Sequence, residues 1–134
     1  MSRTEPFVIH EKNCELEDWG DSKIGRSRWR TLISKDRTPS ADLTVGVAEL
    51  EPNESLTFRP HKHTQVEVYY VLAGEGIVTL AGTEHAVCSG NAIYIPAGVE
   101  HTARNVGAQT LRLLYIFKAN SFSEISYEFC SGPD

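Results

Sequence analysis

The chain has 134 residues, a length typical of one domain, and carries 18 acidic against 13 basic side chains. The basic residues form no block, so the composition argues against nucleic-acid binding. No apolar run is long enough to span a membrane, and the first residues lack the apolar stretch of a secretion signal. Three widely spaced cysteines fit reduced thiols, so we expect a cytoplasmic protein without a disulfide framework.

The N-terminal part of the chain gives mixed signals. Phe7–Ile9 is a candidate short strand, and the acidic stretch Glu15–Gly20 is predicted as a loop or one helical turn. Arg28–Ser34 is the clearest strand of this part, because it contains aromatic and β-branched residues and is followed by polar turn formers. Lys35–Ala41 contains turn-forming residues and is predicted as a loop.

From residue 42 onward the predicted elements are almost all strands. Apolar residues alternate with others over 43–48, which is the period of a strand. Further strands are predicted at 55–63, 67–72, 77–80, 86–88, 92–95, 101–106, 110–117 and 125–129. Short strands separated by turn signals, without a helical period, indicate an all-β fold of the sandwich or barrel type.

One stretch, from His61 to Glu67, carries candidate metal ligands. His61 and His63 are one residue apart on a predicted strand, so their side chains would share a face. Glu67 follows shortly afterwards, and His101 comes just after the predicted turn 96–98. Three imidazoles and one carboxylate are a plausible ligand set for a divalent transition metal.

Two blocks of sequence resemble the two motifs of the cupin superfamily. The first, from His61 to Gly74, has the spacing His-x-His-x3-Glu-x6-Gly. The second, from Gly90 to Asn105, has the spacing Gly-x5-Pro-x-Gly-x2-His-x3-Asn. The one unmatched motif position is Ser55, where the family usually has glycine.

This resemblance implies a double-stranded β-helix, which is a small jelly-roll barrel, formed by residues 1–134 as a single domain. The motif core would cover 43–117, with an N-terminal strand segment at 5–34 and a C-terminal strand at 122–129. The implied ligands of one divalent transition-metal ion are His61, His63, Glu67 and His101. The ion is Fe, Mn, Ni, Zn or Cu, which the sequence does not distinguish. The alternative is a metal-free cupin whose histidines bond to one another or to a ligand.

Tyr69 is a candidate catalytic residue, because it shares a strand face with Glu67 and would point into the same cavity. A phenol beside a divalent cation can act as ligand, proton donor or base, since the positive charge favours the phenolate. The alternative is an aromatic side chain that lines the barrel and packs its core.

Several stretches also resemble the small single-domain cupins that cleave dimethylsulfoniopropionate. They are residues 28–30, 47–49, 67–69, 94–96 and the tail from 117 through 125–127. In those enzymes one tyrosine lies at the metal and a second, near the C-terminus, lines the pocket. The matching residues here are Tyr69 and Tyr127, so the resemblance makes both candidate catalytic residues. The resemblance implies β-elimination of a small carboxylate substrate to dimethyl sulfide and acrylate, with Tyr69 as the base.

Three more side chains are candidates for binding that substrate. Trp29 and Phe117 would pack with Tyr127 around the cationic sulfur, which an aromatic face attracts, although Trp29 also suits the core. Arg59 shares strand parity with His61 and would either reach a substrate carboxylate or lie solvated at the rim.

Other functions stay open from the sequence. Three histidines and one glutamate suit a mononuclear non-haem metal dioxygenase, because they leave coordination positions for substrate or dioxygen. A non-enzymatic metal- or ligand-binding cupin is the other alternative. Small cupins often pair through their N-terminal strands, so we expect a homodimer, with Glu5–His10 as the pairing segment.

Overall fold

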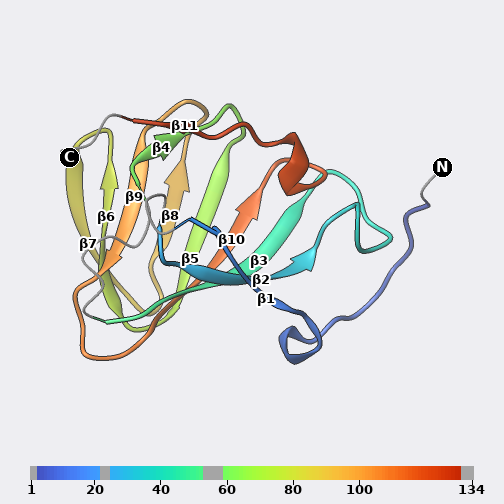
Figure 1. Cartoon of the computed structure of the whole chain (residues 1–134), viewed down its shortest axis with the longest axis horizontal. Coiled ribbons are helices and arrows are strands. Elements are labelled where there is room, and N and C mark those ends of the chain that lie inside the picture. The colour runs from blue at the N-terminus through green and yellow to red at the C-terminus, as the bar shows by residue number, and fades with distance from the viewer. Residues whose placement is uncertain (1–2, 22–24, 53–58, 131–134) are drawn as a thin grey trace.

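The computed structural model describes residues 3–21, 25–52 and 59–130, and these form an almost entirely β structure (Figure 1). One sheet contains β1 (Leu16–Asp18), β2 (Arg28–Ile33), β3 (Thr44–Leu50), β5 (Glu67–Ala73), β8 (Ala92–Ile95) and β10 (Leu111–Phe117). The other contains β4 (His61–Lys62), β6 (Glu75–Leu80), β7 (Thr83–Cys88), β9 (His101–Asn105) and β11 (Glu128–Phe129). Two short 3-10 helices are η1 (Glu11–Asn13) and η2 (Phe122–Glu124).

The two sheets are antiparallel and face each other as a jelly-roll barrel. Their strand orders are β1-β2-β3-β10-β5-β8 and β11-β4-β9-β6-β7 (Figure 1). Neighbours in these orders are mostly far apart in the chain, as expected when a β-helix winds between two sheets. The predicted fold class, an all-β double-stranded β-helix in a single domain, is confirmed. No helix among the described residues is long and apolar enough to cross a membrane.

The core lies between the sheets and follows the period of two. On β5, Tyr69 and Val71 are buried, whereas Tyr70 and Leu72 are exposed. The same alternation on β10 buries Leu111, Leu113, Tyr115 and Phe117. Because side chains alternate across a strand, the inward tyrosine of β5 is Tyr69, as predicted.

Three predictions at the ends of the chain were wrong in whole or in part. Phe7–Ile9 forms no strand. Glu15–Gly20 contains strand β1, because Leu16–Asp18 pairs with β2, and this pairing outweighs the weak strand propensity of an acidic stretch. The predicted strand 122–129 is mostly η2 and irregular chain, and only β11 pairs with β4. Ser55 and the rest of 55–58 lie outside the described residues, and within the described part of the predicted strand 55–63 only His61–Lys62 is strand.

The close packing of β10 against β3 requires a glycine at position 46. A Cβ atom at position 46 would overlap the Tyr115 hydroxyl and lie 2.7 Å from the Arg30 carbonyl oxygen. At Gly107 the nearest atom to such a Cβ is 3.6 Å away, which is an ordinary contact.

We therefore expect Gly46→Ala to lower the free energy of unfolding by about 2 kcal/mol, because overpacking forces neighbouring atoms to move. Denaturant unfolding of the purified variants measures this loss. Gly107→Ala is the matched control and should cost much less. Equal stability of the two variants would contradict the close approach of Tyr115 to β3.

Candidate metal centre

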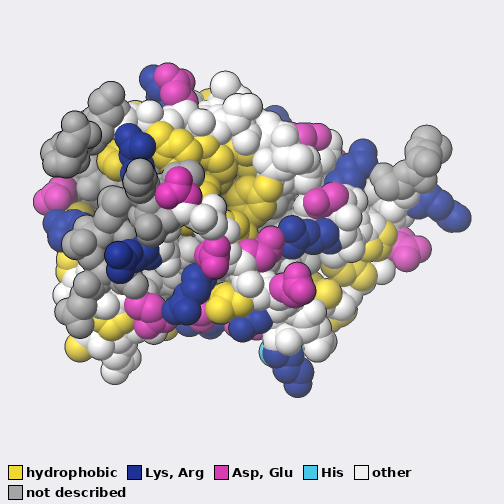
Figure 2. Space-filling model, viewed as in Figure 1, with side chains coloured by type: hydrophobic (Ala, Val, Ile, Leu, Met, Phe, Trp, Pro, Cys, Tyr) yellow, Lys and Arg dark blue, Asp and Glu magenta, His cyan; other side chains and the backbone are white. Residues whose placement is uncertain are grey.

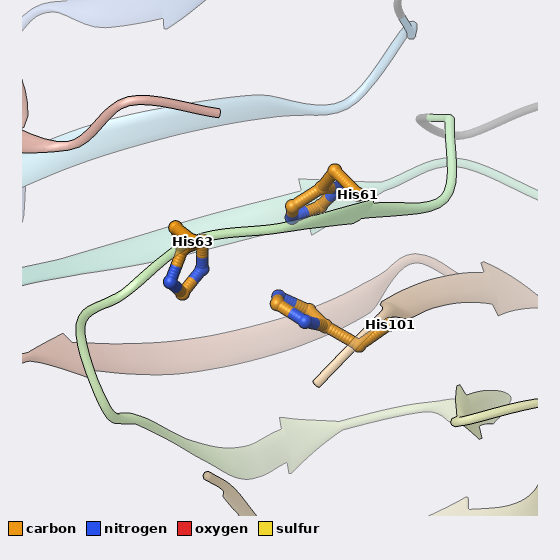
Figure 3. Close-up of side chains that lie close together, drawn as sticks. All are labelled: His61, His63 and His101. Carbon is orange, nitrogen blue, oxygen red and sulfur yellow. The ribbon is translucent and has the colours of Figure 1, made fainter. Parts of the chain in front are cut away.

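Three buried histidines meet between the sheets. His61 on β4 lies opposite His101 on β9, and His63 follows two residues after His61. One ring nitrogen of each histidine lies within 4.8 Å of the others, and Figure 3 shows the three rings turned toward a common space. Each residue is at most 4% exposed. The shared face predicted for His61 and His63 is therefore present, and β9 brings the third imidazole to it.

Backbone hydrogen bonds set the tautomer of all three rings. The Nδ1 atoms of His61, His63 and His101 lie 2.8, 2.9 and 2.8 Å from backbone carbonyl oxygens two residues away. A carbonyl oxygen only accepts, so each Nδ1 carries a hydrogen, and in the neutral ring Nε2 is the nitrogen with the lone pair. Fixing the ring through Nδ1 in this way is the usual preparation of a histidine for metal binding through Nε2.

Glu67, the first residue of β5, adds a carboxylate to this group. Its Oε1 lies 3.2 Å from Nε2 of His63 and 3.2 Å from Nε2 of His101, and the side chain is 3% exposed. In the neutral tautomer with the hydrogen on Nδ1, these Nε2 atoms do not donate to the carboxylate, and His101 Nε2 is buried without a hydrogen bond. Acceptors that converge without a donor fit a cation between them, so the cluster suits a divalent metal.

His61 is in the protonation state that a metal requires. Burial, and next the neighbouring His101, lower the pKa of His61 to about 3. The ring is therefore neutral at physiological pH, and a neutral imidazole is the form that binds metals.

Two irregular segments deliver the ligands. The chain bends at Thr64 and Gln65, so Glu67 lies on β5 of the other sheet. Before β9, Gly98 has a φ of 78°, which favours glycine, and its N–H donates to the His63 carbonyl oxygen at 2.8 Å. This hydrogen bond ties the turn that precedes His101 to the segment that carries the first two histidines.

Two tyrosines lie beside the cluster. Tyr69 is buried, and its ring centroid is 6.3 Å from that of His101. The Tyr127 ring lies 5.0 Å from His61 and 5.5 Å from His63. Burial, followed by the negative charge of Glu67, raises the pKa of both phenols well above the usual range. The protein groups on their own therefore keep both tyrosines protonated.

A cavity of about 260 Å³ opens beside the cluster. It is lined by Asp18, Trp19, Ser27, Trp29, Ala48, Leu50, His61, Glu67, Tyr69, Leu113, Tyr115, Phe117, Phe122, Ile125 and Tyr127. Figure 2 shows hydrophobic side chains gathered on this face, between the side of β11 and β4 and that of β1–β3. None of the lining residues in the described part of the chain is Lys or Arg, whereas two are acidic.

The structure brings most of the candidate substrate residues to this cavity. Trp29, Phe117 and Tyr127 line it, and their contact with a substrate stays a prediction. Arg59 does not line it, because its guanidinium donates to the Cys130 carbonyl oxygen at 3.0 Å and lies 6.0 Å from the Phe129 ring centroid. The substrate role of Arg59 stays a prediction, and the geometry lends it no support.

Sequence reasoning missed several lining residues, above all Asp18, Trp19 and Phe122. The first two belong to the stretch interpreted as a loop, and they reach the cavity only because β1 pairs with β2. The available signal was the two tryptophans of the chain, Trp19 and Trp29, whose spacing fits a hairpin that brings the two rings together.

Comparisons with known proteins agree with this fold. The family model described as Cupin domain matches residues 46–117. The chain is 40% identical over 127 residues to dimethylsulfoniopropionate lyase DddW of Ruegeria pomeroyi, and the match covers 95% of this chain and 82% of that protein.

Solved structures give the same picture of the fold. The polyketide cyclase RemF from Streptomyces resistomycificus superposes with a TM-score of 0.79 at 23% identity, over 97% of this chain and 89% of that one. A chain from the crystal structures of the DMSP lyases RdDddP and RnDddQII gives a TM-score of 0.69 at 16% identity, over 88% and 63% of the two chains. At such identities these likenesses concern the fold alone.

We expect purified protein to bind one divalent transition-metal ion per chain. Replacing His101 or Glu67 by Gln should weaken binding at least tenfold, because each change removes one of the converging acceptors. Elemental analysis after dialysis against a weak chelator measures retention. His85→Gln, which changes an exposed histidine on β7, is the control and should keep its metal. Unchanged metal content in the His101 and Glu67 variants would contradict the assignment.

Proposed function

The chain belongs to the Cupin domain family, and on that premise we propose that it is a metal-dependent lyase. The substrate is dimethylsulfoniopropionate or a similar small carboxylate, and the products are dimethyl sulfide and acrylate. The observation that carries the proposal is the 40% identity to dimethylsulfoniopropionate lyase DddW along 95% of this chain. The cavity adds chemical support, because aromatic rings line it and a converging His–Glu cluster lies at one end.

His61, His63, Glu67 and His101 are the residues that would hold the metal. A divalent ion held there would bind the substrate carboxylate, stabilise the negative charge that develops as the α-proton leaves, and favour the phenolate of Tyr69. The cavity lining supports this role for a cation, because no Lys or Arg among its described residues is available to pair with the carboxylate.

Tyr69 is the proposed base. It lies on the same face of β5 as Glu67, with its ring 6.3 Å from His101, so a carboxylate held at the cluster brings its α-carbon toward this phenol. Tyr69 takes the α-proton, and the electron pair of that C–H bond becomes the new carbon–carbon double bond. The bond from the β-carbon to sulfur breaks, and its electron pair leaves with neutral dimethyl sulfide. Because the leaving group is neutral, no general acid is needed.

The aromatic wall suits the cationic end of the substrate. Trp29, Phe117 and Tyr127 line the cavity, and an aromatic face attracts a sulfonium through its ring quadrupole. Tyr127 packs against two histidines of the cluster, at 5.0 and 5.5 Å, so it forms the wall next to the metal end. We assign Tyr127 a binding role beside Tyr69 as the base.

The test of this function is the release of dimethyl sulfide from dimethylsulfoniopropionate, measured in the headspace over metal-loaded and metal-free protein. We expect release only from the loaded form. A metal-filled protein that releases none would contradict the proposed reaction. Oxygen consumption with candidate enols or thiols would then identify a dioxygenase, which the same ligand set can serve.

Tyr69→Phe should abolish turnover and leave the metal content unchanged, because it removes the phenolic oxygen and keeps the packed ring. Single-turnover release of dimethyl sulfide measures the effect. Tyr70→Phe is the matched control: it makes the same chemical change at the next residue of β5, whose side chain is 42% exposed on the outer face. Retained activity in Tyr69→Phe would exclude Tyr69 as the base.

We also propose that the chain forms a homodimer. Val8 is 99% exposed in an N-terminal segment outside the strands, and Tyr94 on the outer face of the sheet that contains β5 and β8 is 65% exposed. Apolar side chains exposed on both surfaces favour burial against a second copy. Light scattering should give twice the chain mass of 14.9 kDa, and Tyr94→Glu should shift the protein toward monomer. A monomeric wild-type protein at micromolar concentration would contradict this assembly.

A further inference from the structure

The outermost strand of the large sheet, β1, supplies a part of the cavity wall that lies outside the matched family region. Asp18 and Trp19 line the cavity at the end of this strand. The indole N–H of Trp19 donates to the hydroxyl of buried Ser27 at 2.9 Å, just before β2 begins. This bond fixes the indole against β2, so Trp19 is a prearranged surface of the cavity.

Trp19 lies close to the metal end of the cavity. Its ring packs in an edge arrangement against Trp29 and Tyr127, with centroid distances of 5.2 and 5.4 Å. Tyr127 in turn lies 5.0 Å from His61, so one ring separates Trp19 from the histidine cluster. A short zwitterion with its carboxylate at the cluster would therefore bring its cationic head to these indole rings.

Asp18 precedes Trp19 in the chain and also lines the cavity, with an exposed side chain. Its carboxylate accepts a hydrogen bond from the Gly20 N–H at 2.7 Å. Arg28, its partner on β2, forms its ion pair with Glu51 at 3.1 Å. Within residues 3–21, 25–52 and 59–130, no basic side chain forms an ion pair with Asp18.

We propose that Asp18 and Trp19 bind the cationic head of the substrate and select a permanent positive charge over a neutral group of the same shape. The inference deepens the proposed function and rests on it for the position of the carboxylate at the histidine cluster. The indole face attracts an onium group and excludes water from it, and the carboxylate adds an attraction that bulk salt weakens.

The test compares two ligands of equal shape. 3-(Trimethylammonio)propionate and 4,4-dimethylpentanoate share the carboxylate, the chain length and three terminal methyl groups, and they differ in the positive charge. Calorimetric titration of the metal-loaded protein at low ionic strength measures both affinities. We expect the cationic ligand to bind at least tenfold more tightly, because aromatic and carboxylate attractions act on it alone.

Variants at Asp18 and Trp19, with one control, test whether these two residues cause the preference for the cationic ligand. Asp18→Asn should weaken the cationic ligand about fivefold and leave the neutral ligand unchanged. Trp19→Leu should weaken the cationic ligand about tenfold, and Trp19→Phe, which keeps an aromatic face, should restore most of the loss. Glu84→Gln removes the same charge from exposed β7 and should change neither affinity.

Other results would overturn the inference. These are equal wild-type affinities for the two ligands, no binding of either ligand, or equal losses for both ligands in Asp18→Asn. The experiment measures ligand affinity, so its result is independent of whether the protein catalyses the proposed reaction. A protein that prefers the cation but releases no dimethyl sulfide would keep the subsite and lose the lyase, and a lyase without the preference would lose only the subsite.

Discussion

The structure depends on a carboxylate and three imidazole lone pairs that converge in a buried space. Glu67 Oε1 lies 3.2 Å from two Nε2 atoms, and the backbone holds the hydrogens of all three histidines on the opposite ring nitrogen. Burying a carboxylate among acceptors is costly unless a cation joins them. The two sheets, the bend before β5 and the glycine turn before β9 all serve to hold this arrangement. A metal bound there would therefore also stabilise the fold, since it binds only the assembled site.

Charge is divided along the cavity in a way that matches a zwitterion. The cluster offers the position for a metal cation and so favours a carboxylate, whereas the rest of the wall is mostly aromatic and includes Asp18. Because no described lining residue is Lys or Arg, a metal at the cluster would be the cation that binds a carboxylate, and the rest of the wall suits a positive group. A substrate with one carboxylate and one onium group matches both parts of the cavity. The carboxylate would lie at the cluster and the onium group against the aromatic wall.

Local sequence patterns predicted those parts of the site that depend on residues close together in the chain, and they did not predict those that depend on long-range strand pairing. The shared face of His61 and His63, and the inward direction of Tyr69, follow from strand alternation. The meeting of His101 with His61 across β9 and β4 is a long-range pairing, which the motif resemblance implied and propensity alone did not. Asp18 and Trp19 were missed because β1 forms only through pairing with β2, and the direction of the Arg59 guanidinium depends on the Cys130 carbonyl, far along the chain.

X-ray absorption spectroscopy of the metal-loaded protein tests the central claim most directly, because it reports the atoms bound to the ion. The account predicts three imidazole nitrogens and at least one oxygen at about 2.0–2.2 Å, with the imidazole signal reduced by one in His101→Gln. A first shell with fewer than two imidazoles, or one unchanged by that substitution, would contradict the convergence of His61, His63, Glu67 and His101 on one metal.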